Sequence, residues 1–367
     1  MRDLGPSRRL EAMAEVRDAI EIHAAGRVVM PGFVDGHTRP IAGALPRLLH
    51  GEADPFSLSA YESLGRLSSH TIERQLMRVL DDFVQHGTTT LEATAGLGVD
   101  ERTEFKILRS YAGVRKRTRL LEATVMPACN PPADVSREEY IESLCNGPLA
   151  RIRRNRLAQF AGIRCDPDVY SRRQADRYLT AAKEVGFVPT IQAIADAGAA
   201  GIGVRIGAAS VQHMNSIGSV EADLLASSNT VAVLMPAAVF LGAAGPYPPA
   251  RTLIDMGAAV ALASGYHPPH NLSHSMKTAI ALACRAMGMT VAEAISAATI
   301  NAAHALRIAD RTGSLEYGKQ ADIVILGISD YRDLGQQLGD APVDLAMKMG
   351  RVVYRRSVAQ WPDSGSF

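Results

Sequence analysis

Several apolar runs of this chain end on side chains that could exchange protons or bind an anion. The run "VVMPGFVDGHTRP", at 28–40, ends with His37 and Arg39. "TTTLE" ends with Glu92, and "ASVQHM" carries His213 near its end. Imidazoles exchange protons near neutral pH, and a guanidinium binds a carboxylate through paired N–H groups. These residue types favour acid/base chemistry on a small polar substrate, provided that the fold brings them together.

A second group of candidates lies in "GYHPPHNLSHS", at 265–275, which carries Tyr266, His267, His270 and His274. The three imidazoles could form a metal site. However, the two adjacent prolines make the segment non-helical, and that favours a loop whose polar residues face water.

The elements that would position these residues alternate between strand and helix. "FAGIRCD" predicts a strand, "SRRQADRYLTAAKEVG" a helix and "VPTIQAIAD" a strand, and "SREEYIESLCNG" opens with a Ser-x-x-Glu capping box at Ser136 and Glu139. About eight such units predict an α/β fold with a (β/α)8 barrel, whose chemistry lies at the carboxyl ends of the strands. We place the barrel at 31–310 and a small, N-terminally reduced β lobe at 1–30 and 311–360.

Three stretches resemble the amidohydrolase superfamily, and within it the imidazolonepropionases. They are "GRVVMPGFVDGHT" at 26–38, "GTTTLEATAGLGVDERTEFKILR" at 87–109 and "AISAATINAAHALRIADRTGSLEYGKQADIVIL" at 294–326. The resemblance extends from about Ile20 to Arg355. It implies the same barrel with a β lobe, and ring-opening hydrolysis assisted by a bound metal.

The resemblance also implies which positions would hold that metal. Two histidines of the first strand correspond to His37 and Arg39, that of the fifth strand to Gln192, and the aspartate after the eighth strand to Gly265. The histidine of the sixth strand is kept as His213. Arginine has no free lone pair, glycine has no side chain, and zinc takes three or four N, S or carboxylate ligands. We therefore expect no metal cofactor, with a rearranged zinc or iron site as the alternative.

Arg39 has two possible roles. It could replace the positive charge of the metal and bind a carboxylate or an oxyanion. Alternatively, it could fill the vacated space and pair with Glu92. The resemblance further implies a substrate contact for His267. A histidine of the family's fourth strand corresponds to Ala128, and we predict a substrate contact for the nearby Asn130.

Three functions follow as hypotheses. The first is an enzyme that works without the usual metal, with His37, His213 and Glu92 as catalytic groups and Arg39, Gln192, Tyr266, His267 and Asn130 as substrate-binding groups. Its chemistry would be cyclisation, dehydration, isomerisation or ring opening of a small polar, carboxylated or cyclic-amide substrate. The second is a catalytically inactive metabolite-binding protein. The third is a metal-dependent cyclic-amide hydrolase with rearranged ligands.

The net charge, the cysteine spacing and the length of the apolar runs limit the kinds of partner that the chain is expected to bind. The chain has 367 residues and a formal net charge of +1, so no global charge favours nucleic acid or a membrane surface. Its 4 cysteines form no C-x-x-C pair, which argues against a disulfide framework. No apolar run reaches membrane-spanning length. We expect a cytoplasmic homodimer that acts on a small molecule, and an upstream start remains an alternative.

Overall fold

The structure is a computed structural model. It describes residues 1–11, 13, 19–24, 26–48, 58–96, 100–125, 135–196, 198–242, 245–268, 270–338 and 342–357.

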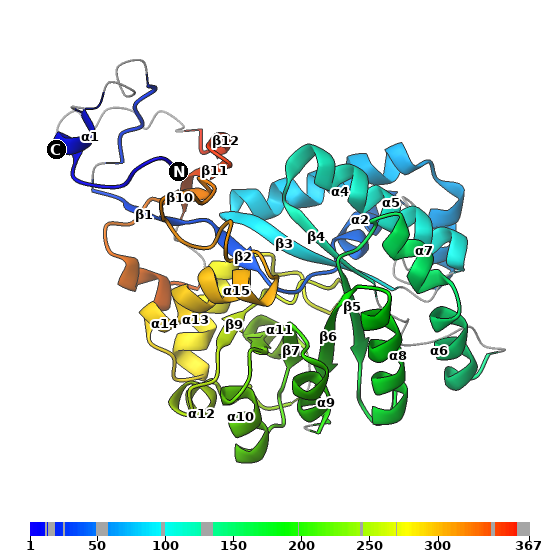
Figure 1. The fold of residues 1–367 in the computed structure, drawn as a ribbon. Helices are drawn as coiled ribbons and strands as arrows, with labels where there is room; N and C mark the ends of the chain where they lie inside the picture. The colour runs from blue at the N-terminus through cyan, green and yellow to red at the C-terminus, as the bar shows by residue number, and fades with distance from the viewer. Residues whose placement is uncertain are drawn as a thin grey trace.

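A parallel sheet of eight strands, counted within these residues, forms the centre of the fold (Figure 1). Its strands are hydrogen-bonded in chain order, and their side chains are almost all buried because helices cover the outer face. The sheet closes nearly into a barrel. The strands are β2 (Phe33–Asp35), β3 (Thr88–Ala95), β4 (Leu121–Val125), β5 (Phe160–Arg164), β6 (Val188–Ala193), β7 (Ser210–His213), β8 (Val231–Leu234) and β9 (Val260–Leu262).

The first and last strands meet through a side chain. Within the described residues no backbone ladder joins β2 to β9. Instead, the Ser264 amide, just after β9, donates to Asp35 Oδ1 at the end of β2, at 3.0 Å. This places a buried carboxylate at the seam of the barrel.

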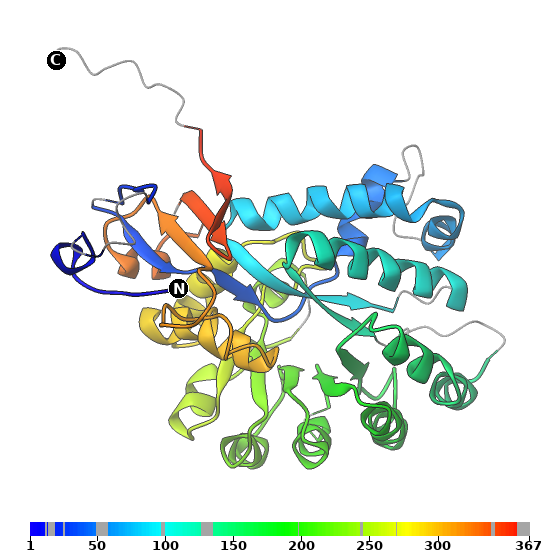
Figure 2. The same cartoon turned by 45° about the horizontal axis from the view of Figure 1, so that its top comes forward.

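Helices surround the strands, as Figure 2 shows. The predicted capping box is confirmed, because Ser136 and Glu139 cap each other's backbone at the start of α6. Ser171 and Gln174 do the same for α8. The helices are α2 (Pro40–Leu48), α3 (Leu58–Ser63), the 3-10 turn η2 (Leu64–Arg66), α4 (Ser69–Gln85), α5 (Glu101–Thr118), α6 (Arg137–Cys145), α7 (Pro148–Arg154), α8 (Arg172–Glu184), α9 (Ala199–Ile206), α10 (Ser219–Ala226), α11 (Pro236–Leu241), α12 (Ala250–Asp255), α13 (Met276–Ala286), α14 (Val291–Ala297) and α15 (Ile300–Ala305).

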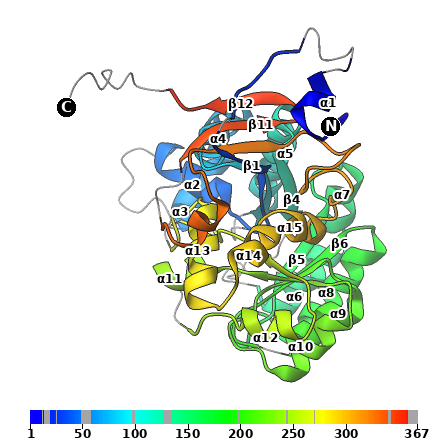
Figure 3. The same cartoon turned by 90° about the vertical axis from the view of Figure 1, so that its left-hand side faces the viewer.

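A small antiparallel sheet lies beside one end of the barrel (Figure 3). Its order is β1 (Val28–Pro31), β10 (Ile323–Leu326), β11 (Val343–Lys348) and β12 (Arg351–Arg355). The chain also forms α1 (Ser7–Glu11) and, between β10 and β11, the 3-10 turn η3 (Tyr331–Gly335), which packs against α13 and α14. Buried Lys348 joins the lobe to the barrel, because its Nζ bonds Asp322 Oδ2 at 2.8 Å and Thr90 Oγ1 at 2.9 Å. The predicted barrel with a small β lobe is therefore confirmed, while the N-terminal reduction of the lobe and the domain limits stay predictions.

No helix in the described ranges combines the length and apolar character needed to cross a bilayer.

Candidate functional site

A cavity of about 340 Å³ opens at the carboxyl ends of the barrel strands. It brings together five of the predicted residues, although they come from distant parts of the chain: His37, Arg39, Gln192, His213 and His267. The other lining residues are Arg164, Ile194, Met235, Ala238, Gly242, Gly265, His270 and Asn271.

His37 is held between an acid and an amide. Its Nδ1 lies 3.3 Å from Glu92 Oε2, and its Nε2 lies 3.3 Å from Gln192 Nε2. The Nδ1 contact lacks hydrogen-bond geometry, so its attraction is electrostatic. The carboxylate favours a proton on Nδ1, which leaves the Nε2 lone pair toward the amide of Gln192 and the cavity. This arrangement sets His37 as a proton acceptor at Nε2.

Glu92 acts from behind His37. Its side chain is buried and does not line the cavity. The Thr38 amide donates to Oε2 at 3.2 Å, and Thr94 Oγ1 donates to Oε1 at 2.7 Å. Glu92 therefore contacts His37 from outside the cavity, and its predicted catalytic role stays a prediction.

Two arginines make the cavity positive. Arg39 Nη1 donates to Gly96 O at 3.1 Å, and no described carboxylate lies within ion-pair distance of it. The interpretation of Arg39 as the partner of Glu92 is therefore wrong. Arg164 pairs with Asp166 at 2.8 Å, but Asp166 lies outside the cavity wall. Because the described lining contains no acidic side chain, the cavity presents net positive charge.

His213 lies with its ring centroid 6.0 Å from that of His37. Burial, with the nearby His37, Arg164 and Arg39, lowers the pKa of His213 to about 3. Burial likewise lowers the pKa of His267 to about 2, with Arg39 contributing. The expectation that His213 titrates near neutral pH is therefore wrong, and its imidazole is a neutral hydrogen-bonding group. His213 also has a left-handed φ of 73°, a strained conformation that is common at functional sites.

Sequence reasoning missed Asp35 and Arg164. Asp35 is fully buried, and Oδ2 has no hydrogen-bond partner among the described residues. Burial raises the pKa of Asp35 to about 7, against hydrogen bonds from Ser264 and His37. A charged residue at the carboxyl end of a predicted barrel strand was the signal for both.

The remaining predicted contacts differ. Tyr266 does not line the cavity, since its ring packs 5.2 Å from that of Phe83, in the core between barrel and helices, and its predicted substrate contact stays a prediction. His274 packs 4.5 Å from the His86 ring. Of the three histidines of the predicted loop, His267 and His270 line the cavity. Asn130 lies outside the described residues.

Comparison with known sequences identifies the family. An imidazolonepropionase of Porphyromonas gingivalis is 36% identical over 357 residues, which cover 92% of this chain and 84% of that protein. The chain belongs to the imidazolonepropionase family of the amidohydrolase superfamily. An imidazolonepropionase of Solibacter usitatus is 32% identical over 93% of this chain and 85% of its own. The sequence model of the Amidohydrolase family matches residues 173–353.

Solved structures show the same fold at low identity. Guanine deaminase of E. coli has a TM-score of 0.72 at 15% identity, covering 97% of this chain and 90% of its own. The 5-methylcytosine deaminase of Klebsiella pneumoniae with phosphonocytosine has a TM-score of 0.71 at 16% identity, covering 93% and 92%. These likenesses concern the fold of this imidazolonepropionase-family chain alone.

Among the described residues, the side chains at this end of the barrel do not form a set of metal ligands. His37 directs Nε2 at the Gln192 amide, and Arg39 presents a cation. Gly265 has a φ of +67°, and a Cβ there would lie 3.2 Å from Met235 Cβ, so the position cannot readily hold an acidic ligand. No group of three His, Cys, Asp or Glu side chains able to hold a metal occurs in the described residues. The donor set falls short of the three or four ligands that zinc takes.

Proposed function

We propose that this imidazolonepropionase-family chain is an enzyme that acts on a small carboxylated substrate, such as a cyclic amide, by acid/base chemistry without the usual metal. The observation that carries the proposal is the positive cavity, in which Arg39 has no carboxylate within ion-pair distance among the described residues, whereas Arg164 is paired with Asp166. A volume of about 340 Å³ suits a small metabolite.

Arg39 is the anion-binding group in this proposal. It lies on the segment that follows β2, where its backbone amide donates to Tyr266 O at 2.7 Å. One Nη1 bond to Gly96 O fixes the guanidinium and leaves its other N–H groups for a carboxylate. Arg164, already held by Asp166, adds charge on the facing strand. Both cations favour negative charge that develops on the substrate.

His37 transfers the proton. Glu92 holds the imidazole from the Nδ1 side and stabilises the imidazolium that forms when Nε2 takes a proton. The substrate group that gives up its proton must first displace the Gln192 amide from His37 Nε2. His213, neutral at physiological pH, is a hydrogen-bond partner for the substrate rather than an acid. Return of the proton to another substrate atom gives isomerisation, and the same group serves cyclisation, dehydration or ring opening.

The binding half of this proposal is tested with 2-pyrrolidone-5-carboxylate, imidazolone propionate and their methyl esters, by titration calorimetry. We expect the carboxylates to bind and the esters to bind at least about tenfold more weakly, because a charge-assisted bond contributes about 1.5–3 kcal/mol. Arg39→Met should abolish this discrimination. Arg109→Met, which removes an exposed arginine of α5 outside the cavity, is the matched control.

Turnover is tested by mass spectrometry of the same mixtures. An unchanged mass with a new retention time indicates isomerisation or cyclisation, loss of one water indicates dehydration, and gain of one water indicates ring opening. His37→Gln should remove turnover without changing carboxylate binding. Equal binding of acids and esters by the unmodified protein would refute the proposal.

One observation favours the second candidate, a metabolite-binding protein. Gln192 occupies the His37 nitrogen that the reaction needs. If the chain only binds metabolites, carboxylates bind with no product, and Gln192→Ala creates no turnover even though it frees Nε2 of His37. If the substrate displaces the amide, the unmodified protein gives product. Gln192→Ala should then keep a measurable kcat, with a KM that is lower or unchanged.

A further inference from the structure

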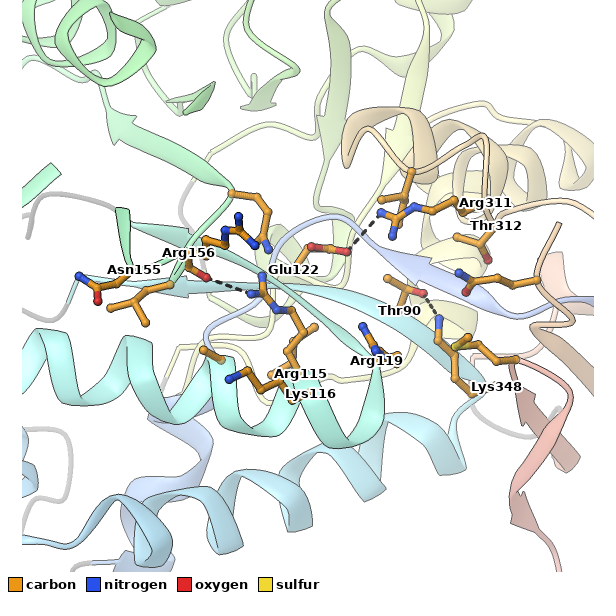
Figure 4. A pocket seen from close by; sticks show the side chains of 17 residues that line it. Thr90, Arg115, Lys116, Arg119, Glu122, Asn155, Arg156, Arg311, Thr312 and Lys348 are labelled. Carbon is orange, nitrogen blue, oxygen red and sulfur yellow. Dashed lines mark hydrogen bonds and ion pairs between the residues drawn. The ribbon is translucent and has the colours of Figure 1, made fainter. Parts of the chain in front are cut away.

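A second cavity, of about 880 Å³, lies at the opposite end of the barrel, against the β lobe. It shares no residue with the candidate active site. Figure 4 shows side chains of α5 on one side and those of Arg311 and Lys348 on the other. The amino ends of β4 and β5 form its floor, through Glu122 and Gln159.

Positive charge dominates this cavity. Among the described lining residues, six are cations and Glu122 is the one carboxylate. Two cations are already neutralised, because Arg311 lies 3.5 Å from Glu122 and Lys348 lies 2.8 Å from Asp322. The other four have no carboxylate within 4 Å in the described part of the chain: Arg115, Lys116, Arg119 and Arg156. Like charges held this close repel each other unless an anion joins them.

Arg115 indicates where an acceptor is missing. Its Nη2 donates to Arg156 O at 3.0 Å, whereas its Nη1 is buried and has no hydrogen-bond partner among the described residues. A buried donor without a partner costs about 1–3 kcal/mol. An adjoining hollow of about 440 Å³ shares Arg115 and Arg156 and adds Arg153 and Arg154.

Two of these arginines occupy backbone positions that usually hold glycine or asparagine, which indicates that the side chains have a function. Arg119, which follows α5, has a φ of 59°, and Arg156, shortly after α7, has a φ of 53°. Glycine or asparagine usually occupies such left-handed positions after a helix. A cation near the carboxyl end of a helix is stabilised by about 0.3–1 kcal/mol, which could explain the presence of a single arginine. It does not explain why cations from separate elements meet in one cavity with a buried, unbonded guanidinium nitrogen.

We propose that this cavity binds a phosphorylated small molecule. Guanidinium groups match the paired oxygens of phosphate, and several of them fit a di- or triphosphate better than a single carboxylate. The volume suits one molecule of nucleotide size.

The test uses pyrophosphate as the probe, by titration calorimetry on the full chain. We expect one site per chain, with an affinity that falls as salt is raised. The variant Arg119→Gly/Arg156→Gly removes two cations at positions whose backbone suits glycine, so it should fold and should bind at least tenfold more weakly. Thermal melting of the same samples verifies folding.

Arg307→Gly is the matched control. Arg307 is also exposed and left-handed, with a φ of 54°, and it lines neither hollow. Its loss should leave pyrophosphate affinity unchanged. The proposal is overturned if the unmodified protein does not bind pyrophosphate, if the double variant binds equally well, or if the control weakens binding as much. Binding of single-stranded RNA without binding of pyrophosphate would also overturn it.

Discussion

Replacing Asp35 with asparagine should change how stability depends on pH. Asp35 is fully buried at the seam between β2 and β9. Burial raises its pKa from 3.8 to about 7. The folded protein therefore binds this proton more tightly than the unfolded chain does. The stability that this proton contributes is fully present below pH 3.8 and is lost as pH rises to about 7.

The magnitude follows from the two pKa values. One pKa step corresponds to about 1.36 kcal/mol, so the change from 3.8 to about 7 amounts to roughly 4 kcal/mol in the free energy of unfolding. Asparagine cannot ionise and lacks this dependence. Its amide adds a pH-independent cost of about 1–3 kcal/mol if it finds no acceptor. The slope with pH is thus the informative quantity, rather than the absolute stability of the variant.

The assay is urea unfolding of both proteins at several pH values from 5 to 8. We expect the stability of Asp35→Asn, relative to the unmodified protein, to rise by a few kcal/mol across this range. Asp196→Asn is the control, because a hydrogen bond from Arg172 lowers the pKa of Asp196 below this window. The stability of Asp196→Asn relative to the unmodified protein should not change with pH over this range. Parallel curves for Asp35→Asn would show that Asp35 is already ionised at pH 5 and would refute the reasoning.

Three further predictions concern the metal positions, the lobe and the buried imidazole. Arg39→His/Gln192→His should bind about one zinc per chain by metal analysis, because it adds two imidazoles beside His37; no uptake would show that the backbone has also departed from the metal geometry. Lys348→Met should lower the free energy of unfolding by about 3–5 kcal/mol in urea, since it leaves the buried Asp322 carboxylate without its cation, and an exposed Arg351→Met should change little. Nitrogen NMR should show His213 neutral at pH 5, and a protonated ring there would contradict the low pKa.

The fold could be predicted because each unit carried its own local signal. Short stretches of sequence specify the alternation of strand and helix. Examples are the apolar strand β5 and helix α6, which begins with a capping box. Those units place His37, Gln192 and His213 at one end of the barrel, since parallel strands share their carboxyl edge.

The electrostatics of the site could not be predicted in the same way. The low pKa of His213 depends on burial and on arginines from other strands. The raised pKa of Asp35 depends on its burial where β2 meets β9. The direction of Tyr266, away from the cavity and toward Phe83, is likewise a matter of packing. These properties arise only when distant segments meet, so spacing along the chain does not report them.

The metal content of the protein tests the central claim most directly. The protein should be made without a histidine tag, supplied with Zn²⁺ and Fe²⁺, passed through gel filtration and analysed by plasma mass spectrometry. The account predicts far less than one metal per chain, because Arg39, Gln192 and Gly265 stand where ligands would be. A content near one metal per chain would contradict it and would favour a hydrolase with rearranged ligands.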